Sequence, residues 1–279
     1  MAKTKSSIQP KKHFSQNFLV DPHAQQKVLD AMKKVCDMVD LPVIEIGPGQ
    51  GDITKRAVLW GKDYTAIEID KEAVDFLTTE ISTLNFPNFH LIHADVTDMI
   101  RDNLLPTDFS LISSLPYHIG SRLLVDLAIS HPHINFGVIH QKEVTQKTQK
   151  LKSNFTFFGA WLNLFWNCRQ CFEIPKSCFI PQPKVVSAFL EGTSLNSQKE
   201  IWLSDKIKRE NTKNILKKLF SFPNKTLVNN LKALDWNTEE IQYFVQSYCN
   251  NNLNIRLDWS NYRNILQKVA SHNKLKNDK

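Results

Sequence analysis

Three short segments carry residues whose types and order could bind a nucleotide-like cofactor. A glycine-rich turn, 47-GPGQG-51, follows the apolar run 43–46, Glu68 ends the next apolar run, and Asp95 ends the one after that. Carboxylates at such positions can accept strong hydrogen bonds from ribose hydroxyls and from the amino group of a base. Each acid alone is typical of a solvent-facing cap, but glycines and acids at three consecutive strand ends indicate a cofactor site.

The residue after the glycine turn favours one cofactor class over another. A dinucleotide site has the order G-x-G-x-x-G, with a helix N-terminus receiving the pyrophosphate. In this chain Gly47 and Gly49 occupy the first two glycine positions, but Asp52 stands at the sixth. An acidic side chain there would repel a diphosphate and would not repel a cationic sulfonium. The pattern therefore predicts S-adenosyl-L-methionine rather than NAD.

The segment 114-SLPY-117 could hold an exocyclic amine of a base. The Ser114 side chain and the backbone carbonyl of Leu115 or Pro116 can accept hydrogen bonds from its two N–H hydrogens. Tyr117 can stack on the base, a contact worth about 1–3 kcal/mol. The amine of adenine is a poor nucleophile because its lone pair is delocalised into the ring. Catalysis would therefore depend on positioning and charge stabilisation, with no general base needed before a methyl group moves.

Alternating elements of strand and helix would position these residues. We expect strands at 43–46, 64–70, 89–95, 109–117 and 136–141, between helices at 21–39, 52–60, from 71, at 121–130 and at about 155–167, with two late strands around 170–174 and 184–191. This alternation predicts an α/β fold with a mostly parallel sheet and helices on both faces.

The last third of the chain has a different pattern. Residues 192–200, GTSLNSQKE, are polar and read as a linker, and the pattern beyond them is helical at 201–220, 225–234, 238–249 and 259–270. We therefore predict two domains, a cofactor-binding domain over 1–195 and a helical domain over 196–279.

Composition indicates a polyanionic partner. The 279 residues include 35 Lys and Arg against 28 Asp and Glu, giving a net charge of +7 and a pI near 9.1. An excess of bases gathered in clusters favours nucleic acid. The clusters are Lys3, Lys5, Lys11 and Lys12; Lys142, Lys147, Lys150 and Lys152; and Lys206, Lys208, Arg209, Lys213, Lys217 and Lys218.

Other compositional features exclude several classes of protein. No apolar run reaches the roughly 18 residues of a membrane span, and the basic start has no apolar signal region, so we expect no membrane partner. The five cysteines form no even-numbered disulfide framework, which indicates a reducing compartment, and we expect a cytoplasmic protein. The pair Cys168 and Cys171 could be half of a zinc site, but no second pair follows, so we expect no metal.

An ordered set of motifs resembles one family. The set resembles the ribosomal small-subunit RNA adenine N6-dimethyltransferase family (KsgA type), relatives of the erythromycin-resistance methylases, over almost the whole chain. The motifs are 15-SQNFLVD-21, 45-EIGPGQGDIT-54, 67-IEID-70, 93-HAD-95, 115-LPYHI-119, 141-QKEV-144 and 179-FIPQPKVVSA-188. The resemblance implies a class I methyltransferase Rossmann-like sheet with a small C-terminal all-helical domain that binds RNA.

The resemblance also implies an activity and a set of site residues. The activity is dimethylation of two adjacent adenines in small-subunit rRNA, on the immature small ribosomal subunit, by a monomer with a role in subunit assembly. Phe179 would help hold the flipped target base, although a core aromatic is the alternative for it. The residues implied for the S-adenosyl-L-methionine pocket are Asn17, Leu19, Gly47, Gly49, Glu68 and Asp95, with Ser114 at its acceptor side.

Two motifs depart from the family pattern, at three positions. Ser114 stands where the family has Asn; it keeps an acceptor oxygen on a shorter arm, and amino methyltransferases of cytosine have S-P-P-Y there. Pro223 and Asn224 stand where the family has two arginines, which should weaken or alter RNA docking. An impaired member acting as an RNA-binding assembly or transcription factor is therefore one alternative, and methylation of large-subunit rRNA is another. The presence of Gly47, Glu68 and Asp95 together favours the enzyme.

Overall fold

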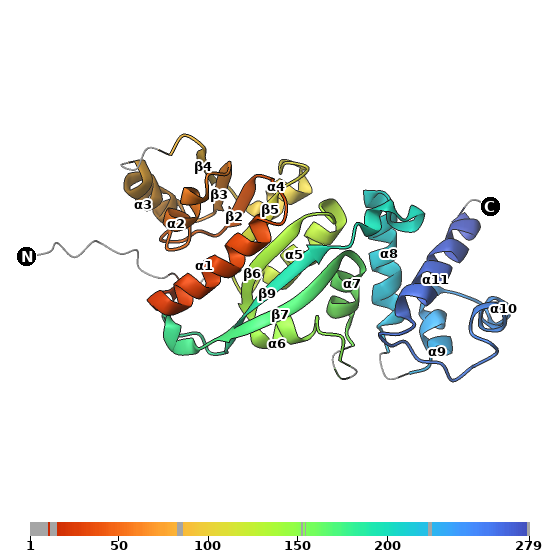
Figure 1. The fold of residues 1–279 in the computed structure, drawn as a ribbon. Coiled ribbons are helices and arrows are strands. Elements are labelled where there is room, and N and C mark those ends of the chain that lie inside the picture. Colours follow the sequence, from red (N-terminus) through yellow and green to blue (C-terminus); the bar gives the residue numbers. More distant parts are fainter. Residues whose placement is uncertain are drawn as a thin grey trace, which may run out of the picture. The chain divides into compact units, whose positions relative to one another are not determined.

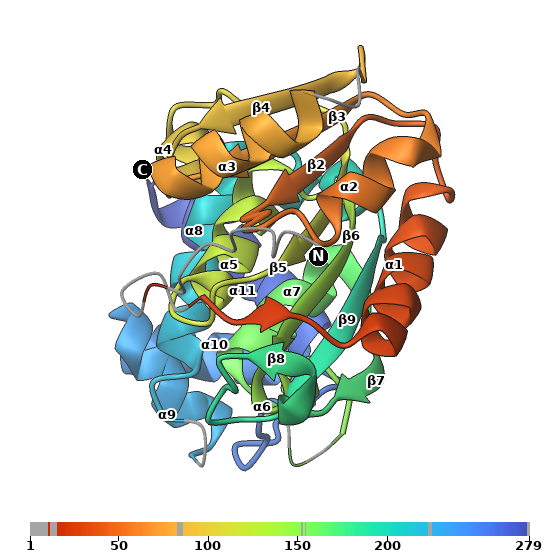
Figure 2. The same ribbon diagram turned by 90° about the vertical axis from the view of Figure 1, so that its left-hand side faces the viewer.

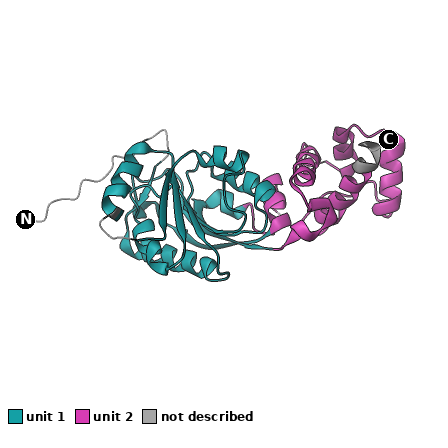
Figure 3. Ribbon diagram, turned by 90° about the horizontal axis from the view of Figure 1, so that it is seen from above, with its two compact units in different colours: residues 1–146, 166–194 teal, residues 147–165, 195–279 magenta. Residues whose placement is uncertain are grey.

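The computed structural model describes residue 11 and residues 16–82, 86–151, 153, 155–222 and 225–277. The chain forms two compact units, coloured separately in Figure 3. Unit 1 comprises Met1–Gln146 and Trp166–Ser194, and unit 2 comprises Lys147–Phe165 and Leu195–Lys279. The segment 147–165 thus groups with the helical unit, whereas the sequence-based division kept it with the cofactor domain. The functional boundary at 195/196 stays a prediction.

Unit 1 contains the sheet and the helices that cover it (Figure 1). Its strands are β1 (Phe18–Leu19), β2 (Val43–Ile46), β3 (Tyr64–Glu68), β4 (Phe89–His93), β5 (Ser110–Ser114), β6 (Asn135–Gln141), β7 (Trp166–Ile174), β8 (Phe179–Ile180) and β9 (Ser187–Ser194). Its helices are α1 (Pro22–Cys36), α2 (Thr54–Ala57), α3 (Lys71–Ser82), α4 (Val96–Arg101), α5 (Gly120–Ser130) and α6 (Lys142–Gln146). Strand β9 runs into the segment 192–200 that was expected to be a linker.

The main sheet has the order β4-β3-β2-β5-β6-β9-β7, which Figure 2 shows from β4 to β7. The strands from β4 to β6 are mutually parallel, and β9 is antiparallel to both of its neighbours. Strands β2 and β5 are adjacent in the sheet, although β3 and β4 separate them in sequence. The chain therefore reverses its direction across the sheet at β2 and β5. Ligands of open α/β sheets bind outside the carboxyl ends of the strands at such a switch point.

Local sequence explains why these elements form. The Asp21 side chain caps α1 by accepting a hydrogen bond from the Ala24 N–H at 2.8 Å, and Pro22 occupies the first turn. The buried face of α1 carries Val28, Leu29, Met32, Val35 and Cys36 and packs on β5, β6 and β9. All four residues of β2 are buried, as expected for a parallel strand covered by helices on both faces. The predicted α/β fold with a mostly parallel sheet is confirmed.

Unit 2 is helical within its described residues. Its helices are α7 (Phe157–Phe165), α8 (Lys206–Leu219), α9 (Leu227–Leu231), α10 (Thr238–Tyr248) and α11 (Tyr262–Asn277). An aromatic cluster organises part of its core, because the Phe155 ring centroid lies 4.9 Å from that of Phe220 and 5.2 Å from that of Trp259. Within the predicted basic cluster on α8, Arg209 is buried and donates to the Leu203 carbonyl at 2.9 Å. Its role is therefore structural, and the lysines carry the accessible charge.

Candidate active site

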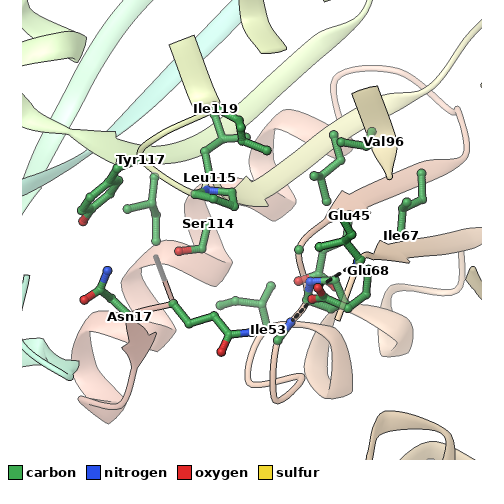
Figure 4. Close-up of a pocket in the computed structure, with 18 of the residues that line it drawn as sticks. Asn17, Glu45, Ile53, Ile67, Glu68, Val96, Ser114, Leu115, Tyr117 and Ile119 are labelled. Carbon is green, nitrogen blue, oxygen red and sulfur yellow. Dashed lines mark hydrogen bonds between the residues drawn. The ribbon is translucent and has the colours of Figure 1, made fainter. Parts of the chain in front are cut away.

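A cavity of about 340 Å³ opens at the carboxyl ends of β2, β3, β4 and β5, at the switch point of the sheet. Figure 4 shows Tyr117 and Ser114 towards one side of it and Glu68, Ile67 and Val96 towards the other. The cavity brings together residues that lie far apart in the sequence. The predicted residues among those that line it are Asn17, Leu19, Gly47, Gly49, Glu68, Asp95, Ser114, Leu115, Pro116 and Tyr117.

The glycine turn between β2 and α2 depends on backbone conformations that favour glycine. Gly47, Gly49 and Gly51 have φ of 67°, 57° and 78°. A Cβ atom on Gly49 would lie 2.9 Å from the Phe18 ring, so a side chain would also displace the N-terminal wall of the cavity. The Gly49 N–H donates to Oε2 of Glu68 at 3.1 Å. The turn therefore positions both the cavity floor and an acid that lines it.

Glu68 is 5% exposed and is held by backbone N–H groups. Its Oε1 accepts from the N–H groups of Ile69 and Asp70, each at 2.9 Å, and Oε2 accepts from Gly49. Burial raises the pKa of this carboxyl, and the three N–H donors oppose that shift. Each carboxylate oxygen has two acceptor positions, so Oε2 retains capacity for a further donor.

Asp95 caps the N-terminus of α4 with one of its two oxygens. Its Oδ1 accepts from the backbone N–H and the hydroxyl of Thr97, both at 2.7 Å. Among the described residues, no hydrogen bond is made to Oδ2. Asp95 therefore combines a structural capping role with an acceptor oxygen that remains open to a ligand donor.

Two further acids line the cavity: Asp52, which sequence reasoning placed beside the cofactor, and Glu45, which it did not assign to the site. Glu45 is 3% exposed and accepts from the Thr54 hydroxyl at 2.6 Å and from the Tyr64 hydroxyl at 2.7 Å. Burial raises its pKa to about 7, against the lowering effect of these two donors. Burial also raises the pKa of Asp52, and Lys55 opposes this shift. The sequence did offer a signal for Glu45, because it is the single acidic residue within the apolar strand VIEI.

The N-terminal segment forms one wall of the cavity because β1 pairs with β8. In this two-residue antiparallel ladder Leu19 lies opposite Phe179, and Phe18 lies opposite Ile180. Phe179 is 1% exposed, packs in the core with Leu19, and is not among the residues that line the cavity. Of the two roles considered for Phe179 in the sequence analysis, this position corresponds to the core aromatic. Its contact with a target base stays a prediction.

The turn between β5 and α5 forms the part of the cavity wall that contains Ser114, Leu115, Pro116 and Tyr117, and we call this part the acceptor side. Ser114 ends β5 and is half-buried, and among the described residues no hydrogen bond is made to its Oγ. The Pro116 carbonyl accepts from the N–H groups of Ile119 and Gly120 at 3.1 and 2.9 Å, whereas no described donor reaches the Leu115 carbonyl. Of the two backbone carbonyls predicted as acceptors, that of Leu115 is therefore the more available.

The Tyr117 ring borders this turn and is held at two places. Its hydroxyl lies 2.5 Å from the Ser187 hydroxyl at the start of β9. Its ring is nearly parallel to the His140 imidazole, with an interplanar angle of 3° and centroids 6.2 Å apart. Burial raises the pKa of the Tyr117 phenol, and the contact with Ser187 opposes the rise. The phenol is therefore neutral at physiological pH and can present an uncharged ring face.

Three further features from the sequence analysis concern other parts of the chain: the replaced arginines, a metal site and a membrane span. Pro223 and Asn224, which replace the arginines of the family pattern, lie outside the described residues. Within the described ranges, no group of three or more His, Cys, Asp or Glu side chains is arranged to hold a metal ion. In the same part of the chain, no helix is both long enough and apolar enough to cross a membrane.

Comparisons with known proteins agree with this geometry. The family model for ribosomal RNA adenine dimethylase matches residues 8–270. A ribosomal RNA small subunit methyltransferase A from Campylobacter hominis is 30% identical over 226 residues, covering 80% of this chain and 82% of that protein. A protein of the same name from Parabacteroides distasonis is 31% identical over 234 residues, covering 81% of this chain and 82% of that protein.

Solved structures share the fold, and the predicted class I methyltransferase fold is confirmed. A dimethyladenosine transferase from Plasmodium falciparum aligns with a TM-score of 0.72 at 20% identity, covering 90% of this chain and 96% of that chain. The 23S rRNA methyltransferase ErmE aligns with a TM-score of 0.59 at 20% identity, covering 82% of this chain and 89% of that chain. The family match over nearly the whole sequence, together with relatives at 30% identity, shows that the chain belongs to the ribosomal RNA adenine dimethylase family.

Proposed function

We propose that this protein methylates N6 of adenines in small-subunit rRNA, adding two methyl groups to each target, during assembly of the small ribosomal subunit. The observation that carries the proposal is the single cavity that Glu68 and Asp95 share with Ser114 and Tyr117. A methyl donor and an extruded base can therefore meet there without a rearrangement of the sheet.

The family's methyl donor is S-adenosyl-L-methionine, and the chemistry of the lining residues fits it. When bound, it supplies an electrophilic methyl group on a positively charged sulfur. Four acids, Glu45, Asp52, Glu68 and Asp95, line the cavity and favour a cation over a diphosphate. Glu68 would accept hydrogen bonds from the ribose hydroxyls, and Oδ2 of Asp95 would accept one from the adenine amino group of the cofactor.

The target base would be held on the opposite side of the cavity. The Ser114 hydroxyl and the Leu115 carbonyl would accept hydrogen bonds from the two N6 hydrogens and orient the nitrogen lone pair. The Tyr117 ring would stack on the base, which must first be unstacked from its RNA neighbours. Holding the nitrogen in line with the transferred carbon lowers the barrier mainly by positioning.

Ser114 would still accept a hydrogen bond from N6, although its side chain is shorter than the Asn of the family pattern. A hydroxyl on Cβ can accept one hydrogen bond from N6 or from a bridging water. A misplacement of about 1 Å can cost about a hundredfold in rate, so the reach of Ser114 controls the turnover. We therefore expect a slow enzyme rather than an inactive one.

The RNA would be bound largely through phosphate contacts. The chain carries a net charge of +7, and α8 presents Lys206, Lys213 and Lys217 at half-buried to exposed positions. Lys208 and Lys218 are engaged in ion pairs with Asp205 and Asp235. Phosphate binding by such lysines is independent of sequence and depends on salt. The choice of adenine would therefore come from the cavity and from the accessibility of the RNA loop.

A methyl-transfer assay on three RNA substrates tests this proposal. Purified protein is incubated with labelled S-adenosyl-L-methionine and with immature small subunits, mature small subunits or large subunits from a strain that lacks this methylation. We expect label in immature small subunits, recovered as N6,N6-dimethyladenosine after digestion to nucleosides. Tyr117→Ala serves as the matched variant with an intact cofactor side.

Each alternative has its own outcome in this assay. Label confined to large subunits would support the resistance-type substrate. No label from the wild-type protein, combined with tight binding of immature small subunits, would contradict catalysis and favour an assembly factor.

A further inference from the structure

Ser187 belongs to a sequence motif, 179-FIPQPKVVSA-188, but has no role in the steps described so far. It is the first residue of β9, where its side chain is fully buried. Its backbone lies between two strands, paired with Gln141 of β6 on one side and with Ile174 of β7 on the other. A residue held by ladders on both sides has little freedom, so the position of its hydroxyl is set by the sheet.

The Ser187 hydroxyl contacts a residue of the candidate active site without lining the cavity. Its Oγ lies 2.5 Å from the Tyr117 hydroxyl, whereas Tyr117 borders the cavity and Ser187 does not. A tyrosine side chain anchored only at its Cα can still rotate about two bonds. A hydrogen bond at the far end of the ring removes that freedom and fixes the plane of the ring.

His140 supports the same ring from a second strand. Its imidazole is buried in β6, with a plane 3° from that of the Tyr117 ring and a centroid 6.2 Å away. Nδ1 of His140 accepts from the Gln141 N–H at 2.7 Å, so Nε2 carries the hydrogen and faces the Ser121 hydroxyl at 3.3 Å. A Cβ on Gly120 would lie 2.8 Å from Nε2, so glycine at that position leaves room for the imidazole.

The geometry points to Ser187 as a positioning residue that acts on the target base through the ring of Tyr117. This inference rests on the proposed function, because it assigns the anchored ring to the extruded adenine. Strand β9 holds the hydroxyl end of the ring through Ser187, and β6 places His140 parallel to its face. A base that stacks on a fixed ring is presented to the methyl donor in one orientation, and orientation is the main source of catalysis proposed for this site.

A double-mutant cycle tests whether Ser187 acts through Tyr117. Ser187→Ala and Tyr117→Phe each remove one side of the same hydrogen bond, and both keep an aromatic ring at position 117. We expect each to lower kcat for rRNA methylation about fivefold to tenfold, with KM for RNA changed less than twofold. The variant with both changes should be no slower than either single variant, because the second change removes nothing further.

Thr145→Val is the matched control for loss of a buried hydroxyl in unit 1. Thr145 is fully buried and is not among the residues that line the cavity; its hydroxyl contacts the Lys142 carbonyl at 2.8 Å and the Gln170 side chain. We expect kcat within twofold of wild type for this variant. A similar loss in Thr145→Val and Ser187→Ala, or effects of the two single variants that multiply in the double variant, would overturn the inference.

A measurement that needs no turnover separates this inference from the proposed function. The chain has five tyrosines, so ring-labelled tyrosine gives few signals by NMR, and Tyr117→Phe identifies the signal of Tyr117. Ser187→Ala should shift or broaden that signal, and Thr145→Val should leave it unchanged. If the wild-type protein transfers no methyl group, the proposed function fails while the NMR signal still decides whether Ser187 fixes the ring. An unchanged Tyr117 signal in Ser187→Ala would refute the inference.

Discussion

The cavity has a donor side, lined by Gly49, Glu68 and Asp95, where the methyl donor is proposed to bind, and an acceptor side, lined by Ser114 and Tyr117, where the target base is proposed to bind. These two sides are built in different ways. On the donor side, backbone N–H groups fix the acid Glu68, and the glycine turn that supplies one of them tolerates no side chain at Gly49. On the acceptor side, the contacts of Tyr117 come from side chains on other strands, Ser187 and His140. A site fixed by backbone geometry restricts substitution at each position. A site fixed by side chains can tolerate the replacement of one of them, such as Ser114 in place of the family's Asn, because the positions of the neighbouring residues do not depend on it.

The largest effect is expected on the donor side. Glu68→Ala removes charge-assisted hydrogen bonds worth about 1.5–3 kcal/mol each, so the Kd for S-adenosyl-L-methionine should rise by about a hundredfold or more. Isothermal titration calorimetry measures this Kd, and a thermal unfolding scan checks that the variant is folded. A folded Glu68→Ala protein with wild-type affinity would show that Glu68 does not hold the cofactor.

The acceptor side should respond in turnover rather than in cofactor binding. Tyr117→Ala removes a stacking contact of about 1–3 kcal/mol, so kcat/KM for RNA should fall by about tenfold to a hundredfold. The Kd for S-adenosyl-L-methionine should stay within twofold of wild type. Loss of cofactor affinity in Tyr117→Ala would break the separation of the two sides.

The buried acid Glu45 should give the donor side a pH dependence. Its pKa is raised from 4.5 to about 7, so the folded protein holds a proton there that the unfolded chain has lost between these values. The free energy of unfolding should therefore decrease as pH rises through this window. A cationic cofactor favours the ionised carboxylate, so its Kd should fall as pH rises towards 7, by at most about tenfold per pH unit, and then level off.

Glu45→Gln is the control for this effect, because it keeps the shape and most hydrogen bonds and removes the titration. Cofactor affinity measured from pH 5.5 to 8.5 should be flatter in this variant. The neighbouring groups Glu68 and Asp52 remain, and a slope that persists unchanged in Glu45→Gln would assign the titration to them.

The smallest effect is expected at Ser114. Ser114→Ala removes one acceptor of the target amine, and a single hydrogen bond of about 1 kcal/mol corresponds to about a fivefold loss in kcat. Steady-state kinetics with saturating cofactor measure it. A variant as fast as wild type would mean that the hydroxyl does not contact N6.

The positions of the residues on the donor side could be predicted because their signals are local, and their contact with the cofactor stays a prediction. Apolar strands that end in Gly47, Glu68 and Asp95 must bring these residues to one edge if the strands are parallel, whatever the packing elsewhere. The same reasoning found the segment 114–117. Each residue there was identified from its own strand, without knowledge of distant contacts.

Other features could not be predicted because they depend on contacts between remote segments. The two-residue pairing of β1 with β8 has no periodic pattern, yet it brings Leu19 to the cavity wall and Phe179 into the core. The pKa of Glu45 depends on burial together with Tyr64 and Thr54, which lie on other elements. The late strands also differ from the expected ranges, because β7 starts earlier, at Trp166, and β9 has the expected length but is shifted to Ser187–Ser194.

A single-turnover comparison of wild type and Ser114→Asn tests most directly whether the acceptor side is catalytic. Enzyme in excess over unmethylated small subunits is mixed with labelled S-adenosyl-L-methionine, and methylated adenosine is followed over time. We predict measurable transfer by the wild-type protein and a faster rate for Ser114→Asn, whose amide reaches further towards N6. Transfer by Ser114→Asn together with none by the wild-type protein would contradict the catalytic role of this chain.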